Sequence, residues 1–156
     1  MPDEAKRTAR LMLETLPSLM QAIVSEMRRC DHPMPMPHFR ALMTLSHGPF
    51  TLSELAEHQR VSLPTMSNTV TVLVNNGWAE RVADAGDRRK ADVVMTAEGI
   101  RALREMEARI EDVIVGALKK LPPSDLRSLS DAFGIMQRAF PTRRAIDEQS
   151  AEAAGL

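Results

Sequence analysis

Two groups of polar side chains have the types and spacing to contact a nucleic acid, and the first follows one face of a predicted helix. Short hydroxyls and an amide can hydrogen-bond base edges or phosphates, and the methyl group of a threonine can touch thymine. This group consists of Ser62, Pro64, Thr65, Ser67, Asn68 and Thr71. No lysine or arginine occurs from residue 62 to residue 76, so this face, taken alone, could also be a solvated helix surface.

The second group is basic and lies in a predicted β-hairpin. An arginine at a hairpin tip can enter a narrow minor groove of DNA, where the negative potential is strongest. The group consists of Asp87, Arg88, Arg89 and Lys90, with Arg81 on the preceding strand. The same charges could instead only keep the hairpin tip soluble, and Arg81 could either reach a phosphate or pair with a nearby acid.

Other chemistry has weaker support in the sequence. The single cysteine, Cys30, follows Arg28 and Arg29, which could activate a thiolate, but we expect a structural role. Prolines prevent helical spacing among the nearby potential metal ligands Cys30, Asp31, His32 and His38. The chain also lacks a phosphate-binding glycine loop, a nucleophile elbow and an HExxH helix. We therefore expect no metal, no cofactor and no enzymatic activity.

The elements that must position these side chains are mostly helical, because apolar residues recur at steps of three or four. A first amphipathic helix is predicted over residues 11–29, where Pro17 either kinks the helix or marks a restart. Three prolines predict an extended connector over residues 32–37. A short helix follows and ends before His47.

Two further helices, joined by a short turn, predict a helix-turn-helix. Thr51 and Glu54 fit a capping box that begins the first of them. Ser62 is a good N-cap for the second helix, and Asn75-Asn76-Gly77 is a signal for its end.

A pair of strands is predicted next, over residues 78–82 and 91–95. In the second strand Ala91, Val93 and Met95 alternate with Asp92 and Val94, so the first three are expected to face inward. A hairpin directly after a helix-turn-helix is a wing.

Two long helices complete the chain, and each carries an apolar seam. They follow Thr96 and the Pro122-Pro123 pair, after which Ser124 can cap the last helix. Two seams exceed what a small winged-helix core can absorb, so we expect one of them to meet a second subunit. The seam residues are Leu103, Met106, Ile110, Val113, Ala117, Leu126, Leu129, Phe133, Met136 and Phe140.

Length and composition limit the kind of protein further. A chain of 156 residues is about one domain long, so residues 1–156 are expected to form a single domain. With 20 basic and 21 acidic residues the net charge is -1, which excludes a histone-like protein held on nucleic acid by bulk positive charge. The charged N-terminus and the lack of a long apolar run predict a cytoplasmic protein without a membrane span.

Together these features resemble the multiple antibiotic resistance regulator (MarR) family of bacterial winged-helix transcription factors. The order of elements matches from about residue 11 to residue 140. The motifs that carry the resemblance are Leu52-Ser-Glu-Leu-Ala56, Val61-Ser62, Gly77-Trp-Ala-Glu-Arg81, Asp87-Arg-Arg89 and Met95-Thr-Ala-Glu-Gly99. Arg60 stands where a glycine often permits a left-handed turn, which predicts backbone strain. Asn68 and Thr71 stand where arginine and aspartate are common.

The resemblance implies a mainly helical fold with a small β-hairpin wing and with N- and C-terminal dimerisation helices. The winged helix-turn-helix lobe would span residues 38–98, and the dimerisation helices would span 1–31 and 99–140. The tail, 141–156, is polar.

The resemblance also implies a function. The chain would be a homodimeric repressor that binds a pseudo-palindromic operator in double-stranded DNA and is released by a small aromatic or phenolic effector or by oxidation. Arg89 would enter the minor groove, and Asp87 would orient it. The alternative is a winged-helix protein-interaction or ligand-sensing module with weak or no specific DNA binding, which the near-neutral charge favours.

Overall fold

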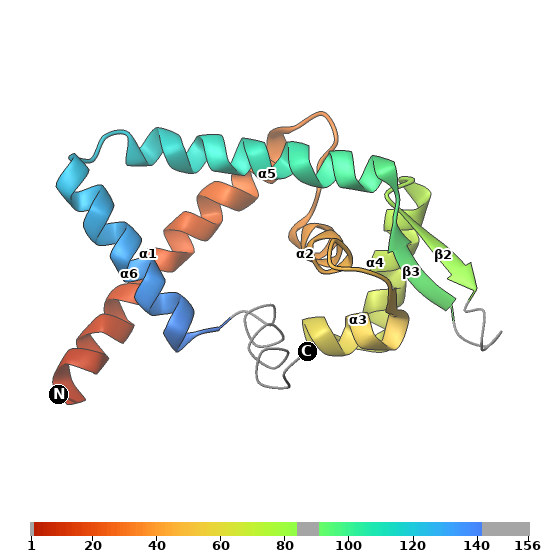
Figure 1. The fold of residues 1–156 in the computed structure, drawn as a ribbon, viewed down its shortest axis with the longest axis horizontal. Coiled ribbons are helices and arrows are strands. Elements are labelled where there is room, and N and C mark those ends of the chain that lie inside the picture. Colours follow the sequence, from red (N-terminus) through yellow and green to blue (C-terminus); the bar gives the residue numbers. More distant parts are fainter. Residues whose placement is uncertain (1, 84–90, 142–156) are drawn as a thin grey trace, which may run out of the picture. The chain divides into compact units, whose positions relative to one another are not determined.

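The computed structural model describes residues 2–83 and 91–141. It is mainly helical with a small antiparallel sheet, as the sequence predicts (Figure 1). The helices are α1 (Pro2–Arg29), α2 (Met36–Leu45), α3 (Leu52–Gln59), α4 (Leu63–Asn75), α5 (Ala97–Leu118) and α6 (Pro123–Ala139). The strands are β1 (Phe50–Thr51), β2 (Ala79–Ala83) and β3 (Ala91–Met95). The chain divides into two compact units, Met1–Val113 and Ile114–Leu156.

The first helix is longer than the apolar pattern predicts. It begins at Pro2 and continues through Pro17, so a restart at that proline was a wrong interpretation. Met27, near its end, is buried, whereas Leu11 and Leu13 in its first half are exposed, Leu13 to 77%. No helix within the described ranges is long and apolar enough to cross a membrane.

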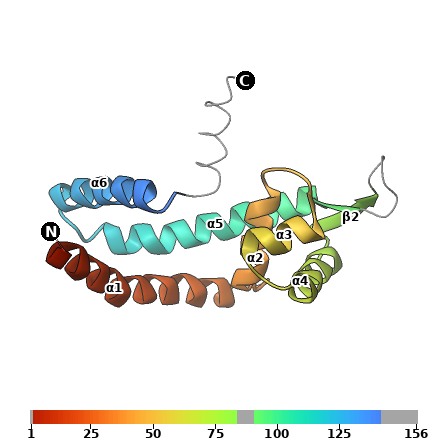
Figure 2. The same ribbon diagram turned by 90° about the horizontal axis from the view of Figure 1, so that it is seen from below.

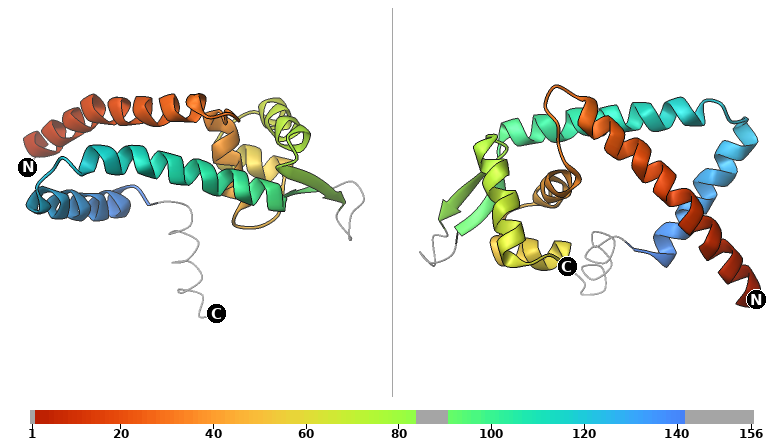
Figure 3. Two further views of the ribbon diagram at one scale, coloured as in Figure 1. Left: turned by 90° about the horizontal axis from the view of Figure 1, so that it is seen from above. Right: turned by 180° about the vertical axis from the view of Figure 1, so that it is seen from behind.

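Three helices and one strand form the core of the winged lobe. Leu42 of α2, Leu55 of α3 and Val70 of α4 are fully buried, because each lies on the apolar stripe of its helix. The second helix begins at Met36, inside the stretch predicted to be an extended connector. Figure 3 shows α4 beside β2, at the side of the lobe that also carries the sheet.

The sheet has the strand order β1-β3-β2 and is antiparallel throughout. The two predicted strands are confirmed, and the two-residue strand β1 adds a third that the sequence did not reveal. Val93 of β3 is buried, as predicted, but Ala91 is exposed and Met95 only partly buried. The inward alternation was therefore wrong at Ala91, because this residue lies at the outer end of the β2–β3 ladder, opposite Ala83.

Hydrogen bonds join the start of α5 to the segment that follows α4. The hydroxyl of Thr96 donates to the carbonyl of Gly77 at 2.5 Å, and the Thr96 N–H donates to the carbonyl of Trp78 at 3.1 Å. A side chain at Gly99 would collide with that same Trp78 carbonyl. The glycine is required here because the first turn of α5 packs directly on the backbone of Trp78.

The first half of the α5 seam packs against other residues of the same chain. Leu103, Met106 and Ile110 are all buried, with Ile110 only 9% exposed. Arg109 of α5 lies 3.7 Å from Glu26 of α1, so the C-terminal end of α1 comes close to this part of α5 (Figure 2). These three side chains therefore contribute to the core of the first compact unit.

The second unit contains α6, which buries none of its residues among the described ones. Phe133 and Ile135 are exposed, and Phe140, directly after the helix, is 66% exposed. The predicted cap at Ser124 was wrong, because Pro122 occupies the N-cap position and Ser124 donates instead to the carboxylate of Asp125 at 3.2 Å.

Candidate nucleic-acid interface

The helix-turn-helix begins with the predicted capping box. The N–H of Glu54 donates to the Thr51 hydroxyl at 3.3 Å, and the Thr51 N–H donates to the Glu54 carboxylate at 2.7 Å. Two free amides at the start of α3 are satisfied in this way, so the first residues of the helix are fixed locally.

The turn between α3 and α4 depends on one left-handed residue. Arg60 has φ 54° and ψ 45°, and it is the only non-glycine residue with positive φ in the part of the chain that the structure describes. Its N–H donates to Glu57 and the N–H of Val61 donates to Ala56, which together form a Schellman motif. The predicted strain is confirmed, and such a conformation costs about 1 kcal/mol for a residue with a side chain.

The start of α4 is capped by Ser62, as predicted. The hydroxyl of Ser62 accepts from the N–H of Thr65 at 3.3 Å and lies 2.8 Å from the Thr65 hydroxyl. These two hydroxyls hold each other in place at the first turn, where a helix that enters a major groove makes most of its base contacts.

One face of α4 is buried and the other is exposed. Met66, Val70 and Leu73 are buried, while most of the predicted contact residues are exposed, with Ser67 partly buried. The exposed ones are Ser62, Pro64, Thr65, Asn68 and Thr71. Sequence reasoning missed two exposed apolar side chains on this helix, Leu63 and Val72, since an apolar residue in a helical pattern is normally assigned to the core.

Arg81 supplies a positive charge beside this uncharged helix. It lies on β2, and its guanidinium donates to the hydroxyl of Thr71 at 3.5 Å. No carboxylate of the described residues lies within ion-pairing distance of it. Whether Arg81 contacts a phosphate or pairs with an acid stays a prediction, since Asp84 and Asp87 lie outside the described residues.

The charged residues at the tip of the predicted wing lie outside the described residues; they are Asp87, Arg88, Arg89 and Lys90. The strands on either side of them pair as far as Ala83 and Ala91. Their proposed contacts with DNA stay predictions.

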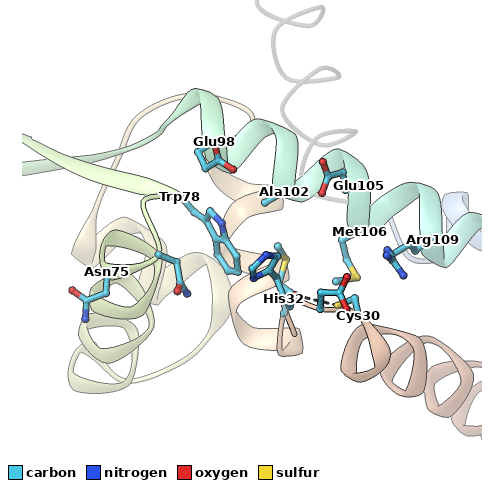
Figure 4. Close-up of a pocket in the computed structure, with 12 residues that line it drawn as sticks. Cys30, His32, Asn75, Trp78, Glu98, Ala102, Glu105, Met106 and Arg109 are labelled. Carbon is cyan, nitrogen blue, oxygen red and sulfur yellow. Dashed lines mark hydrogen bonds between the residues drawn. The ribbon is translucent and has the colours of Figure 1, made fainter.

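A cavity of about 460 Å³ lies between the α1–α2 connector, the end of α4 and α5 (Figure 4). Trp78 and Glu98 line one end, and Met106 and Arg109 line the other. Asp31 and Glu105 add two further carboxylates. Its volume is typical of a pocket for a small organic molecule.

The residues considered for metal or redox chemistry do not converge. The thiol of Cys30 donates to the carbonyls of His32 at 3.1 Å and Met27 at 3.3 Å. Burial lowers the pKa of His38, and its Nδ1 has no hydrogen-bond partner among the described residues. Within the described ranges, no three histidine, cysteine or acidic side chains are grouped so that they could hold a metal ion.

Comparison with known proteins supports the class that this geometry defines, a winged helix-turn-helix protein. Residues 32–90 match the model of the MarR family. A search of curated proteins found no match. This match over residues 32–90 confirms the resemblance to the MarR family that the motifs carry.

Solved structures share this fold over most of the chain. RV1404 from Mycobacterium tuberculosis has a TM-score of 0.77 at 22% identity, covering 86% of this chain and 92% of that one. A MarR family protein from Bacillus stearothermophilus also has a TM-score of 0.77, at 17% identity, with coverages of 91% and 99%. Sco3205, a MarR family transcriptional regulator from Streptomyces coelicolor solved in complex with DNA, has a TM-score of 0.65 at 23% identity, with coverages of 93% and 92%.

Proposed function

We propose that this protein is a DNA-binding transcriptional regulator that acts as a homodimeric repressor on a pseudo-palindromic operator. The observation that carries the proposal is the exposed polar face of α4, which a capped, tightly turned helix-turn-helix presents beside Arg81. The complex of Sco3205 with DNA supports the assignment, since that protein has the same fold.

Each recognition helix, α4, would lie in a major groove. Asn68 can pair in a bidentate manner with adenine, and the methyl groups of Thr65 and Thr71 can touch thymine. Arg81 would bind a phosphate, and Arg89 would enter the flanking minor groove. A two-fold dimer places the two half-sites about one helical turn apart, roughly 10 bp.

Release by an effector would use the cavity beside Trp78. The indole offers a surface for an aromatic ring. Glu98 is paired with Arg101, and the two other carboxylates, Asp31 and Glu105, outnumber the single guanidinium of Arg109 in the lining. This balance favours a neutral or cationic aromatic compound over an aromatic carboxylate. Such a ligand releases DNA only if it binds the non-binding conformation more tightly than the DNA-binding one.

The test is a fluorescence titration of the protein on duplexes from its own upstream region and on scrambled duplexes, across a salt series. Arg89→Ala should make the log-log salt slope of the dimer shallower by about two, one unit for each subunit. Asn68→Ala should change which bases are preferred and leave the slope nearly unchanged.

A protein-interaction or ligand-sensing module is the second candidate, and the absence of any cation from residue 62 to residue 76 favours it. Wild-type protein that shows no salt-dependent binding to any duplex would make this candidate the leading one.

A further inference from the structure

Arg60 occupies a backbone conformation that glycine would adopt more easily. Its φ of 54° closes the Schellman motif at the end of α3. Every hydrogen bond of that motif is made by backbone atoms, so the turn needs a left-handed residue and makes no use of an arginine side chain.

Nothing else within the described chain uses the side chain of Arg60 either. The residue is exposed, and no hydrogen bond or ion pair joins its guanidinium to another residue in the described ranges. The strain is therefore not offset by a hydrogen bond or ion pair of this side chain with any described residue. A strained residue without such compensation indicates a role outside the fold.

The position of Arg60 suggests what that role is. It lies two residues before Ser62, the N-cap of α4, and α4 has no lysine or arginine of its own. Arg81 stands beside Thr71, nearer the other end of the same helix. An uncharged helix thus has one arginine before its first turn and another beside its third turn.

A helix in the major groove has the phosphates of the groove edges near its ends, and contacts to them fix its position without reading sequence. We propose that Arg60 contacts a DNA phosphate from the turn of the helix-turn-helix. This contact would fix the position of the N-terminal end of α4 in the groove, as a phosphate contact of Arg81 would fix its C-terminal half. This inference rests on the proposed DNA-binding function.

The test measures folding stability and DNA binding on the same variants. Arg60→Gly removes both the strain and the charge, so its melting temperature should rise while its DNA affinity falls. Specific and scrambled duplexes should lose affinity by the same factor, because phosphates carry no sequence. The dimer's salt slope should become shallower by about two, so the loss of affinity between about 50 and 200 mM salt should be roughly tenfold smaller than in the wild type.

Two matched variants separate the charge from the backbone. Arg60→Asn tolerates the left-handed conformation without a charge and should bind DNA as Arg60→Gly does. Arg60→Lys keeps the charge in the strained conformation and should keep the wild-type melting temperature and salt slope. Arg101→Ala, which removes an arginine paired with Glu98 on α5, should leave the salt slope unchanged.

The outcomes are distinguishable. Wild-type protein that binds DNA, together with an Arg60→Gly variant of equal affinity and slope, would overturn the inference and leave the proposed function standing. A lower melting temperature in Arg60→Gly would also overturn it, because the arginine would then be structural. Wild-type protein that binds no duplex would remove the proposed function and this inference together.

Discussion

Helices α5 and α6 carry the same apolar spacing, yet their side chains have different surroundings. On α5, Leu103, Met106 and Ile110 are buried in the first compact unit. On α6, Phe133 is exposed and Met136 only partly buried, and no residue of that helix is buried among those described. A repeat of three and four residues identifies which side of a helix is apolar, but it does not say whether that side packs within the chain or stays available to a partner.

We therefore expect a disrupted α5 seam to lower the folding stability of the chain, and a disrupted α6 seam to weaken association with a second subunit. The largest effect is expected for Ile110→Glu, which places an unpaired charge at a buried position. We expect the free energy of unfolding to fall by about 4 kcal/mol or more, a large share of a typical domain's stability. Thermal unfolding followed by circular dichroism measures it.

The control for this change is Glu107→Gln, at an exposed position on the same helix, which should alter stability by no more than about 0.5 kcal/mol. An Ile110→Glu protein with the melting temperature of the wild type, but with half the molecular mass that the wild type has in solution, would contradict the comparison. It would place the α5 seam between subunits.

Phe133→Ala tests the other half of the comparison. If the α6 seam meets a second subunit, losing this side chain removes about 1.5–3 kcal/mol of burial and raises the dimer Kd by about tenfold to a hundredfold. Light scattering across a concentration series measures the change. The helical signal of the diluted protein should stay as in the wild type, and an unchanged Kd would exclude Phe133 from the interface.

Gly99→Ala tests how firmly α5 is fixed to the lobe. The new methyl group would meet the carbonyl of Trp78, and we expect a destabilisation of about 1–3 kcal/mol by urea unfolding. Gly116→Ala is the matched control, because nothing lies within 4 Å of a side chain there and alanine favours a helix by up to about 1 kcal/mol. Equal effects of the two changes would mean that α5 does not pack on this carbonyl.

The smallest expected effect is a pH dependence of folding stability that comes from His38. It belongs to the winged lobe, because α6 contains no histidine. Burial holds the pKa of His38 below the ordinary value of about 6.5, so its neutral form is favoured in the folded state. Its contribution to stability is complete above that ordinary pKa and is lost as the pH falls through the lowered value. His38→Gln should therefore reduce the loss of melting temperature between about pH 7 and pH 5; a loss equal to that of the wild type would assign the dependence to other groups.

The parts of the fold that could be predicted from sequence are those decided within a few residues. The capping box of Thr51 and Glu54 and the N-cap at Ser62 each follow from local hydrogen bonding. The left-handed turn at Arg60 was predicted only from the resemblance to the MarR family, in which a glycine often stands at that position. The polar face of α4 follows from helical periodicity in the same way.

The parts that could not be predicted depend on residues far apart in the chain. Strand β1 has only two residues and exists because Phe50 and Thr51 pair with β3, about forty positions later. The contact of Arg81 with Thr71 and the burial of Ile110 likewise depend on how separate elements pack. No local pattern contains that information.

The left-handed turn at Arg60 also has a consequence for how this protein can evolve. Every arginine codon is a single base change away from a glycine codon, so point mutation repeatedly offers this position a residue that suits its backbone better. On the role inferred for Arg60, a lineage that accepts the change gains a more stable chain and a regulator that leaves its genes less tightly controlled. Selection on protein abundance and selection on gene expression then act in opposite directions on one codon.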